Sequence, residues 1–139
     1  MSKYRSTTHT TYNIGYHVVF CTKYRYRLLR YSAASRLKEI LLCRSESLSI
    51  SICAMEVMPE HVHLFVSAPP SLSIDSIVRE LKGYSSRRLR SEYTYLCRYP
   101  SLWTRSYFVE TIGHISEKTV VQYIEKQKSQ IKHALSSPA

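Results

Sequence analysis

Two strand-like runs separated by only three residues constrain the fold of this chain most strongly. In segment 48–57 the apolar residues alternate with polar ones, and segment 61–66 is rich in β-branched and aromatic residues. Met58-Pro59-Glu60 interrupts them, because proline cannot donate a hydrogen bond to a sheet ladder. We therefore expect an antiparallel hairpin in the middle of the chain.

The segments on either side of this hairpin alternate between strand and helix patterns. In chain order they predict a strand at 12–22, a helix with Ser32 as its N-cap, a helix capped by Ser71 or Ser73, a strand at 107–112 and a last helix at about 116–133. The resulting order is β-α-β-β-α-β-α. It predicts an α+β fold, the ferredoxin-like or RRM-like split βαβ sandwich, with a mainly antiparallel sheet and helices on one face.

The chain length indicates one domain. With 139 residues, of which 44% are hydrophobic, we expect a single domain at 1–139, with a core at about 12–133 and tails at 1–11 and 134–139. The sequence shows neither a membrane-spanning apolar run nor a secretory signal, so we expect a cytoplasmic protein without a membrane partner. The cysteines form no C-x-x-C pair, and we expect buried thiols at Cys21, Cys43, Cys53 and Cys97.

The charge balance indicates a polyanionic partner, with nucleic acid as the leading candidate. Lys and Arg total 20 against 10 Asp and Glu, a formal net charge of +10. No glycine-rich phosphate loop can be drawn from three glycines, so we expect no nucleotide cofactor. Candidate DNA-binding residues fall in two basic tracts: Lys23, Arg25, Arg27 and Arg30, interleaved with tyrosines, and Arg79, Lys82, Arg87, Arg88 and Arg90. The alternative for the first tract is a solvated loop whose tyrosines pack locally.

A His-x-His pair lies in the second strand of the predicted hairpin. Side chains at i and i+2 share one face of a strand, so His61 and His63 point the same way, while Val62 and Leu64 face the core. Two such imidazoles can converge on one divalent ion. The alternative is that one histidine is an ordinary hydrogen-bonded surface residue. Phe65 occupies the third place that a histidine-triad hydrolase would need, which excludes that class.

The last predicted helix carries a second pair of polar residues. Tyr123 and Gln127 are four residues apart, so their side chains project together from the border of the apolar stripe. The alternatives are an amphipathic tyrosine with its ring packed and a surface glutamine.

Four motifs together resemble the HUH-superfamily single-tyrosine transposases of small bacterial and archaeal insertion sequences, a family with TnpA-type and REP-associated tyrosine transposases. The resemblance covers residues from about 12 to 127, in the family's order and approximate spacing. Glu60 stands where aspartate is common in the family. The motifs are YHVVF with KYR at 16–25, MPEHVHL at 58–64, LWTRSYFV at 102–109 and QYIEKQ at 122–127.

The resemblance implies a DNA transposase that cleaves and rejoins single-stranded DNA at insertion-sequence ends and recognises subterminal DNA hairpins. It implies that Tyr123, on the C-terminal helix, is the nucleophile that forms a 5′-phosphotyrosine and frees a 3′-hydroxyl. It further implies Mg²⁺ or Mn²⁺ held by His61, His63 and Gln127, and a homodimer with composite active sites.

Two other functions remain open on the sequence. An HUH replication or mobilisation nickase would share the chemistry, although such enzymes usually carry extra domains. A non-enzymatic ferredoxin-like RNA-binding module would need exposed aromatic residues on the central strands.

Overall fold

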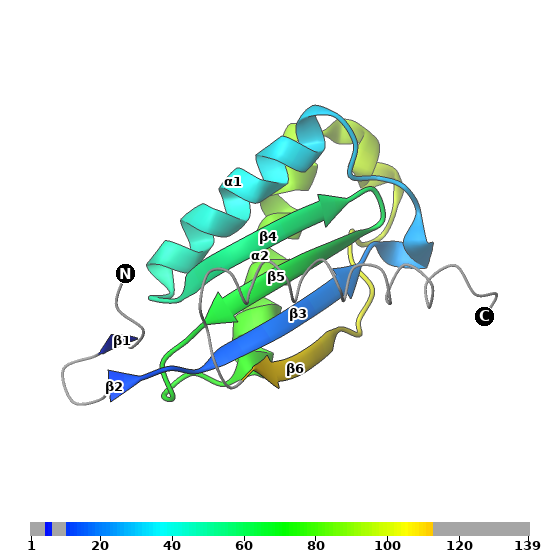
Figure 1. The fold of residues 1–139 in the computed structure, drawn as a ribbon. Coiled ribbons are helices and arrows are strands. Elements are labelled where there is room, and N and C mark those ends of the chain that lie inside the picture. Colours follow the sequence, from blue (N-terminus) through cyan, green and yellow to red (C-terminus); the bar gives the residue numbers. More distant parts are fainter. Residues whose placement is uncertain (1–4, 7–10, 113–139) are drawn as a thin grey trace.

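The computed structural model describes residues 5–6 and 11–112, and its main sheet has the predicted central hairpin (Figure 1). The elements are β1 (Arg5–Ser6), β2 (Thr11–Tyr12), β3 (Gly15–Cys21), the 3-10 helix η1 (Lys23–Arg25), α1 (Ser32–Ser47), β4 (Ser51–Met58), β5 (His61–Ser67), α2 (Ile74–Glu92), the 3-10 helix η2 (Thr94–Arg98) and β6 (Phe108–Ile112). The predicted last helix, at about 116–133, lies outside the described residues.

The main sheet has four strands in the order β4-β5-β3-β6, and every neighbouring pair is antiparallel. β3 therefore lies between β5 and β6, as a split βαβ sandwich requires. The α+β prediction is confirmed. The strand predicted at 12–22 is divided, because β2 ends at Tyr12 and pairs with β1 in a small second sheet, whereas β3 begins at Gly15.

Both long helices cover the same face of the sheet (Figure 1). The apolar residues of α1 and α2 recur at helical spacing and pack against alternate residues of the central strands, which places the core between the two layers. Among the described residues, no helix is both long and apolar enough to span a membrane. The core includes Val18, Phe20, Leu37, Leu41, Val62, Leu64, Val66, Ile77 and Leu81.

The two helices begin differently. Ser73 caps α2 as predicted, since its side chain accepts a hydrogen bond from the backbone N–H of Ser76. The prediction that Ser32 caps α1 is wrong, because Tyr31 occupies the N-cap position without a capping side-chain bond. Ser32 Oγ instead accepts a hydrogen bond from the hydroxyl of Tyr93 at 3.0 Å.

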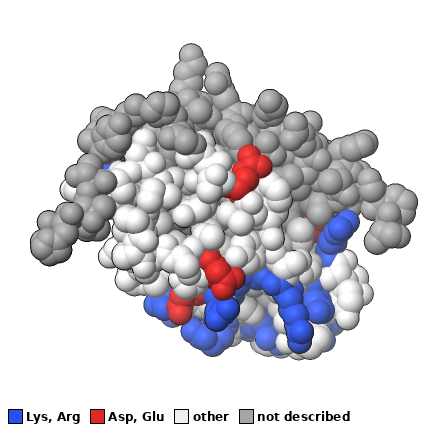
Figure 2. All heavy atoms as spheres, turned by 90° about the horizontal axis from the view of Figure 1, so that it is seen from below, with Lys and Arg blue, Asp and Glu red and all other residues white. Residues whose placement is uncertain are grey.

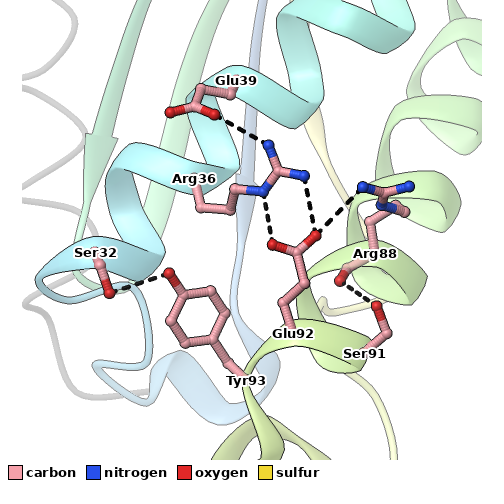
Figure 3. Close-up of polar contacts among 7 residues, drawn as sticks. All are labelled: Ser32, Arg36, Glu39, Arg88, Ser91, Glu92 and Tyr93. Carbon is pink, nitrogen blue, oxygen red and sulfur yellow. Dashed lines mark hydrogen bonds and ion pairs between the residues drawn. The ribbon is translucent and has the colours of Figure 1, made fainter.

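A polar cluster ties the start of α1 to the end of α2 (Figure 3). The guanidinium of Arg36 donates to both carboxylate oxygens of Glu92, at 2.7 and 3.0 Å, and to Glu39 at 3.0 Å. The hydrogen bonds from Arg36 lower the pKa of Glu92. Since the bidentate contact is geometrically specific, it fixes the spacing of the two helices at this end.

The expectation of buried thiols is wrong for three of the four cysteines. Cys43, Cys53 and Cys97 are exposed, and Cys21 is half-buried. Cys43 lies on the outer side of α1, Cys53 lies at the register shift between Ile52 and Ala54 in β4, and Cys97 lies in η2. None of these positions faces the core.

Candidate active site

The two histidines of β5 lie side by side on the sheet face that points away from the helices. Val62 and Leu64 lie in the core, as predicted, and strand alternation places His61 and His63 on the opposite face. Their exposed fractions are only 1% and 0%. The alternative of an ordinary surface histidine is therefore wrong for both.

The imidazoles of His61 and His63 converge. Their Nε2 atoms are 3.0 Å apart, and the ring centroids are separated by 4.8 Å. Two neighbouring ligands of an octahedral ion, each about 2.1 Å from it, lie roughly 3.0 Å apart, so this spacing fits a shared divalent ion. Within the part of the chain that the structure describes, no three His, Cys, Asp or Glu side chains are arranged to hold a metal. Completion of a metal site would thus require a ligand of another type or from outside these residues.

Glu60 orients His61. The carboxylate Oε1 of Glu60 lies 2.9 Å from Nδ1 of His61, so this nitrogen donates its proton to the carboxylate. Nε2 then keeps its lone pair and faces His63. A carboxylate behind the imidazole is a common arrangement in metal sites, because it fixes the tautomer and the ring orientation. The sequence marked Glu60 only as a departure from the family pattern.

His17 of β3 is a residue that the sequence reasoning missed. Its Nε2 lies 3.2 Å from Nδ1 of His63, and the two rings are stacked with centroids 5.4 Å apart and an interplanar angle of 12°. His17 is fully buried, and burial lowers its pKa from 6.5 to about 4. It is therefore neutral at neutral pH and able to accept the Nδ1 proton of His63, which leaves Nε2 of His63 unprotonated.

Tyr123 and Gln127 lie outside the described residues, so their predicted roles remain predictions. The described site comprises His61, His63, Glu60 and His17. Glu60 bonds to the ring of His61 and His17 bonds to the ring of His63, and the two Nε2 atoms face each other between these pairs.

The first basic tract lies next to the histidines. The backbone N–H of Thr22 donates to the carbonyl of Glu60, and that of Leu29 donates to the carbonyl of Pro59, both at 2.9 Å. The loop between these bonds is thus held at the His61 end of the sheet. Of the predicted residues, Lys23 is half-buried, and the side chains of Arg25, Arg27 and Arg30 are exposed.

The second basic tract lies on α2, and most of its cations contact acceptors within the chain. Figure 2 shows Lys and Arg gathered on the side where α2 lies. Lys82 donates to the carbonyls of Thr104 and Ser106, and burial lowers its pKa. The structure therefore gives Lys82 a contact that ties α2 to the chain before β6. Of the other cations, Arg79 pairs with Asp75 and Arg88 pairs with Glu92. Arg90 donates to the carbonyl of Tyr99, and Arg87 is exposed.

Comparisons with known proteins point to one family. Residues 10–127 match the family model described as "Transposase IS200 like". The chain is 37% identical over 119 residues to the ISDra2 transposase TnpA of Deinococcus radiodurans, covering 84% of this chain and 85% of that protein. It is 31% identical over 130 residues to the transposase for insertion sequence element IS200 of Salmonella typhimurium, covering 91% and 85%.

Solved structures show the same fold. The crystal structure of a candidate transposase from Deinococcus radiodurans R1 matches with a TM-score of 0.73 and 35% identity, covering 88% of this chain and 97% of that one. A REP-associated tyrosine transposase bound to a REP hairpin matches with a TM-score of 0.57 and 21% identity, covering 93% and 74%.

Proposed function

Because the chain belongs to the IS200-like transposase family, we propose that it cleaves and rejoins single-stranded DNA at insertion-sequence ends with Tyr123 as nucleophile. The observation that carries this proposal is the pair of buried imidazoles whose Nε2 atoms are 3.0 Å apart, oriented from behind by Glu60 and His17. This buried pair supports metal-assisted phosphoryl chemistry in particular, because it presents two unprotonated nitrogens to one point.

In the proposed reaction the Tyr123 oxygen attacks the scissile phosphorus, and the bond from phosphorus to the 3′ oxygen breaks. The proton lost by the phenol ends on the departing 3′ oxygen. The products are a free 3′-hydroxyl and a 5′-phosphotyrosine. Attack by another 3′-hydroxyl reverses the step and rejoins the strands without ATP, because the tyrosyl ester retains the energy of the phosphodiester.

We assign the ion to His61, His63 and Gln127. Mg²⁺ or Mn²⁺ bound there would neutralise charge that develops on the phosphate. The chain's own residues prepare the site: Glu60 holds the ring of His61, and His17 holds the ring of His63. Burial of these rings excludes water that would compete for their nitrogens.

The proposed DNA substrate carries hairpins near its ends, and the two basic tracts supply phosphate contacts. A protein of the same fold is bound to a REP hairpin, which supports this part of the proposal. The RNA-binding alternative is disfavoured, because Phe20 and Phe65 on the central strands are buried rather than available for stacking.

A direct test uses a single-stranded oligonucleotide that carries the element end, and its duplex form. In the presence of Mg²⁺ or Mn²⁺, we expect the single strand to become attached to the protein in a complex that survives denaturation. The duplex should remain uncleaved. Equal cleavage of both forms would contradict the proposed substrate.

We propose a homodimer in which each site combines the histidines of one subunit with the tyrosine of the other. Mixing His61→Ala protein with Tyr123→Phe protein should then restore adduct formation, because each mixed dimer contains one intact composite site. Denaturing gels after verified subunit exchange provide the measurement. A mixture that stays inactive would show that the site is assembled within one chain.

His17→Phe should weaken Mn²⁺ binding by about tenfold or more, the usual effect of losing an outer-shell partner of a metal-bound histidine. Phenylalanine preserves the ring that stacks on His63 but has no nitrogen to accept its Nδ1 proton. Isothermal titration with Mn²⁺ measures the affinity, and thermal unfolding verifies the fold. His17→Gln, which retains an acceptor, should bind more tightly than His17→Phe. Wild-type affinity in a folded His17→Phe protein would remove this role from His17.

A further inference from the structure

A groove of about 490 Å³ lies between the start of α1 and the chain that follows α2. We call it the tyrosine groove, because four tyrosines line it together with two arginines. None of its described lining residues is acidic. This composition suits an aromatic, anionic ligand. The residues that matter here are Arg30, Tyr31, Tyr93, Tyr95, Arg98 and Tyr99.

Two of the four rings of the groove, those of Tyr93 and Tyr95, are held in place by hydrogen bonds at their hydroxyl ends. Tyr95 donates to the carbonyl of Leu28 at 2.7 Å, and Tyr93 donates to Ser32 Oγ at 3.0 Å (Figure 3). The contact between Arg36 and Glu92 braces the two helices beside Tyr93. The walls are therefore set before any ligand arrives, which lowers the entropic cost of binding.

Tyr31 differs from the other tyrosines of the groove. Its side chain is 90% exposed, so it contributes little to the core. Its backbone has φ 56° and ψ −131°, a region that glycine tolerates and other residues rarely adopt. A strained backbone that carries an exposed ring does not stabilise the fold. Strain of this kind clusters at functional sites, and here it presents a ring at the edge of a basic groove.

The groove lies at the same end of the molecule as the histidines. The loop that leads to Tyr31 is bonded to the Pro59-Glu60 turn through Thr22 and Leu29. Aromatic rings continue from this loop into the groove, since Tyr24 and Tyr26 have centroids 5.6 Å apart and Tyr26 and Tyr99 have centroids 5.3 Å apart.

We propose that the tyrosine groove binds an unpaired nucleotide of the DNA strand beside the cleaved phosphodiester. The base stacks on Tyr31, and the neighbouring phosphates contact Arg30 and Arg98. This inference rests on the proposed function, since it names the part of the single-stranded substrate that the chain holds. Stacking on aromatic side chains is tolerant of sequence and requires a base that is free of a duplex, so the groove would favour single strands.

The test compares two fluorescein-labelled probes with equal numbers of phosphates: a 20-nucleotide thymidine strand and an abasic strand of the same length. Binding is measured by fluorescence anisotropy in EDTA, which keeps the result independent of any cleavage. Tyr31→Gly should weaken binding of the thymidine strand by at least about fivefold and leave abasic binding unchanged. Arg98→Ala should weaken both, because it removes a phosphate contact.

Stability separates a binding role of Tyr31 from a structural one. Glycine relieves the backbone strain, so the unfolding midpoint of Tyr31→Gly should equal or exceed that of the wild type. Leu42→Ala, which removes an exposed apolar side chain of α1 outside the groove, is the matched control and should bind both probes like the wild type. Unchanged thymidine binding by Tyr31→Gly, an equal loss for both probes, or a lower unfolding midpoint would each overturn the proposal. If the wild type forms the covalent adduct but binds both probes equally, the groove proposal fails and the proposed function stands. If the wild type shows a Tyr31-dependent preference for the thymidine strand but forms no adduct, the proposed function fails.

Discussion

Tyr123→Phe should abolish the covalent attachment of the protein to DNA and leave hairpin binding nearly unchanged. The substitution removes only the oxygen that attacks phosphorus, so phenylalanine keeps the aromatic ring while no ester can form. The adduct is measured on denaturing gels, and binding is measured separately with a labelled hairpin.

Tyr107→Phe is the matched control for this experiment. Tyr107 packs against the core on the helix side of the sheet, and its hydroxyl donates to Oδ1 of Asp75 in α2 at 3.0 Å. His61 and His63 lie on the opposite face, so Tyr107 is badly placed to act with them. The control should form the adduct like the wild type. An adduct that persists in Tyr123→Phe and disappears in Tyr107→Phe would transfer the nucleophile to Tyr107.

His61→Ala and His63→Ala should each reduce cleavage below detection at any practical concentration of Mg²⁺ or Mn²⁺. Each substitution leaves a single imidazole where the structure shows two converging Nε2 atoms, and one nitrogen ligand retains a weakly bound ion poorly. Cleavage assays over a metal titration provide the measurement. The wild type should lose activity in excess EDTA and regain it when Mn²⁺ is added.

Both histidines are buried, so loss of activity must be separated from loss of fold. The unfolding midpoint and the affinity for hairpin DNA are measured on the same preparations. Met58→Ala is a useful comparison, because Met58 is the cross-strand partner of His61 on β4 and lies on the same face. It should retain metal-dependent cleavage. Wild-type cleavage in excess chelator, or a folded His63→Ala protein with normal activity, would rule out the proposed metal site.

Several features that are set by residues close together in the sequence are predicted correctly. Proline and the alternation around it indicated the β4-β5 hairpin, and period two placed His61 and His63 on one face. The cap of α2 followed from Ser73 and the apolar stripe behind it. All of these depend on residues within a few positions of one another.

The features that escaped prediction depend on contacts between distant parts of the chain. His17 meets His63 only because β3 pairs with β5, and the register of that pairing is absent from either strand's own pattern. The bonds from Lys82 to carbonyls 22 and 24 residues away are likewise absent from the local pattern, and its contact with DNA stays a prediction.

The start of α1 was mispredicted for a similar reason. Tyr31 is the N-cap residue, and the side chain of Ser32 bonds instead to the hydroxyl of Tyr93, which is 61 residues away. The same contact joins two residues that line the tyrosine groove, so the groove could not be predicted from the segment around Ser32.

The polarity of the covalent link between protein and DNA tests the proposed role of Tyr123 directly. A single-stranded substrate is labelled on one side of the cleavage site or the other, incubated with the protein and Mg²⁺, and separated under denaturing conditions. We expect only the 3′-side fragment to stay attached, through its 5′ phosphate on Tyr123, and the other fragment to end in a free 3′-hydroxyl. Attachment through a 3′ phosphate, or cleavage with no protein attached at any time, would contradict the proposed role of Tyr123.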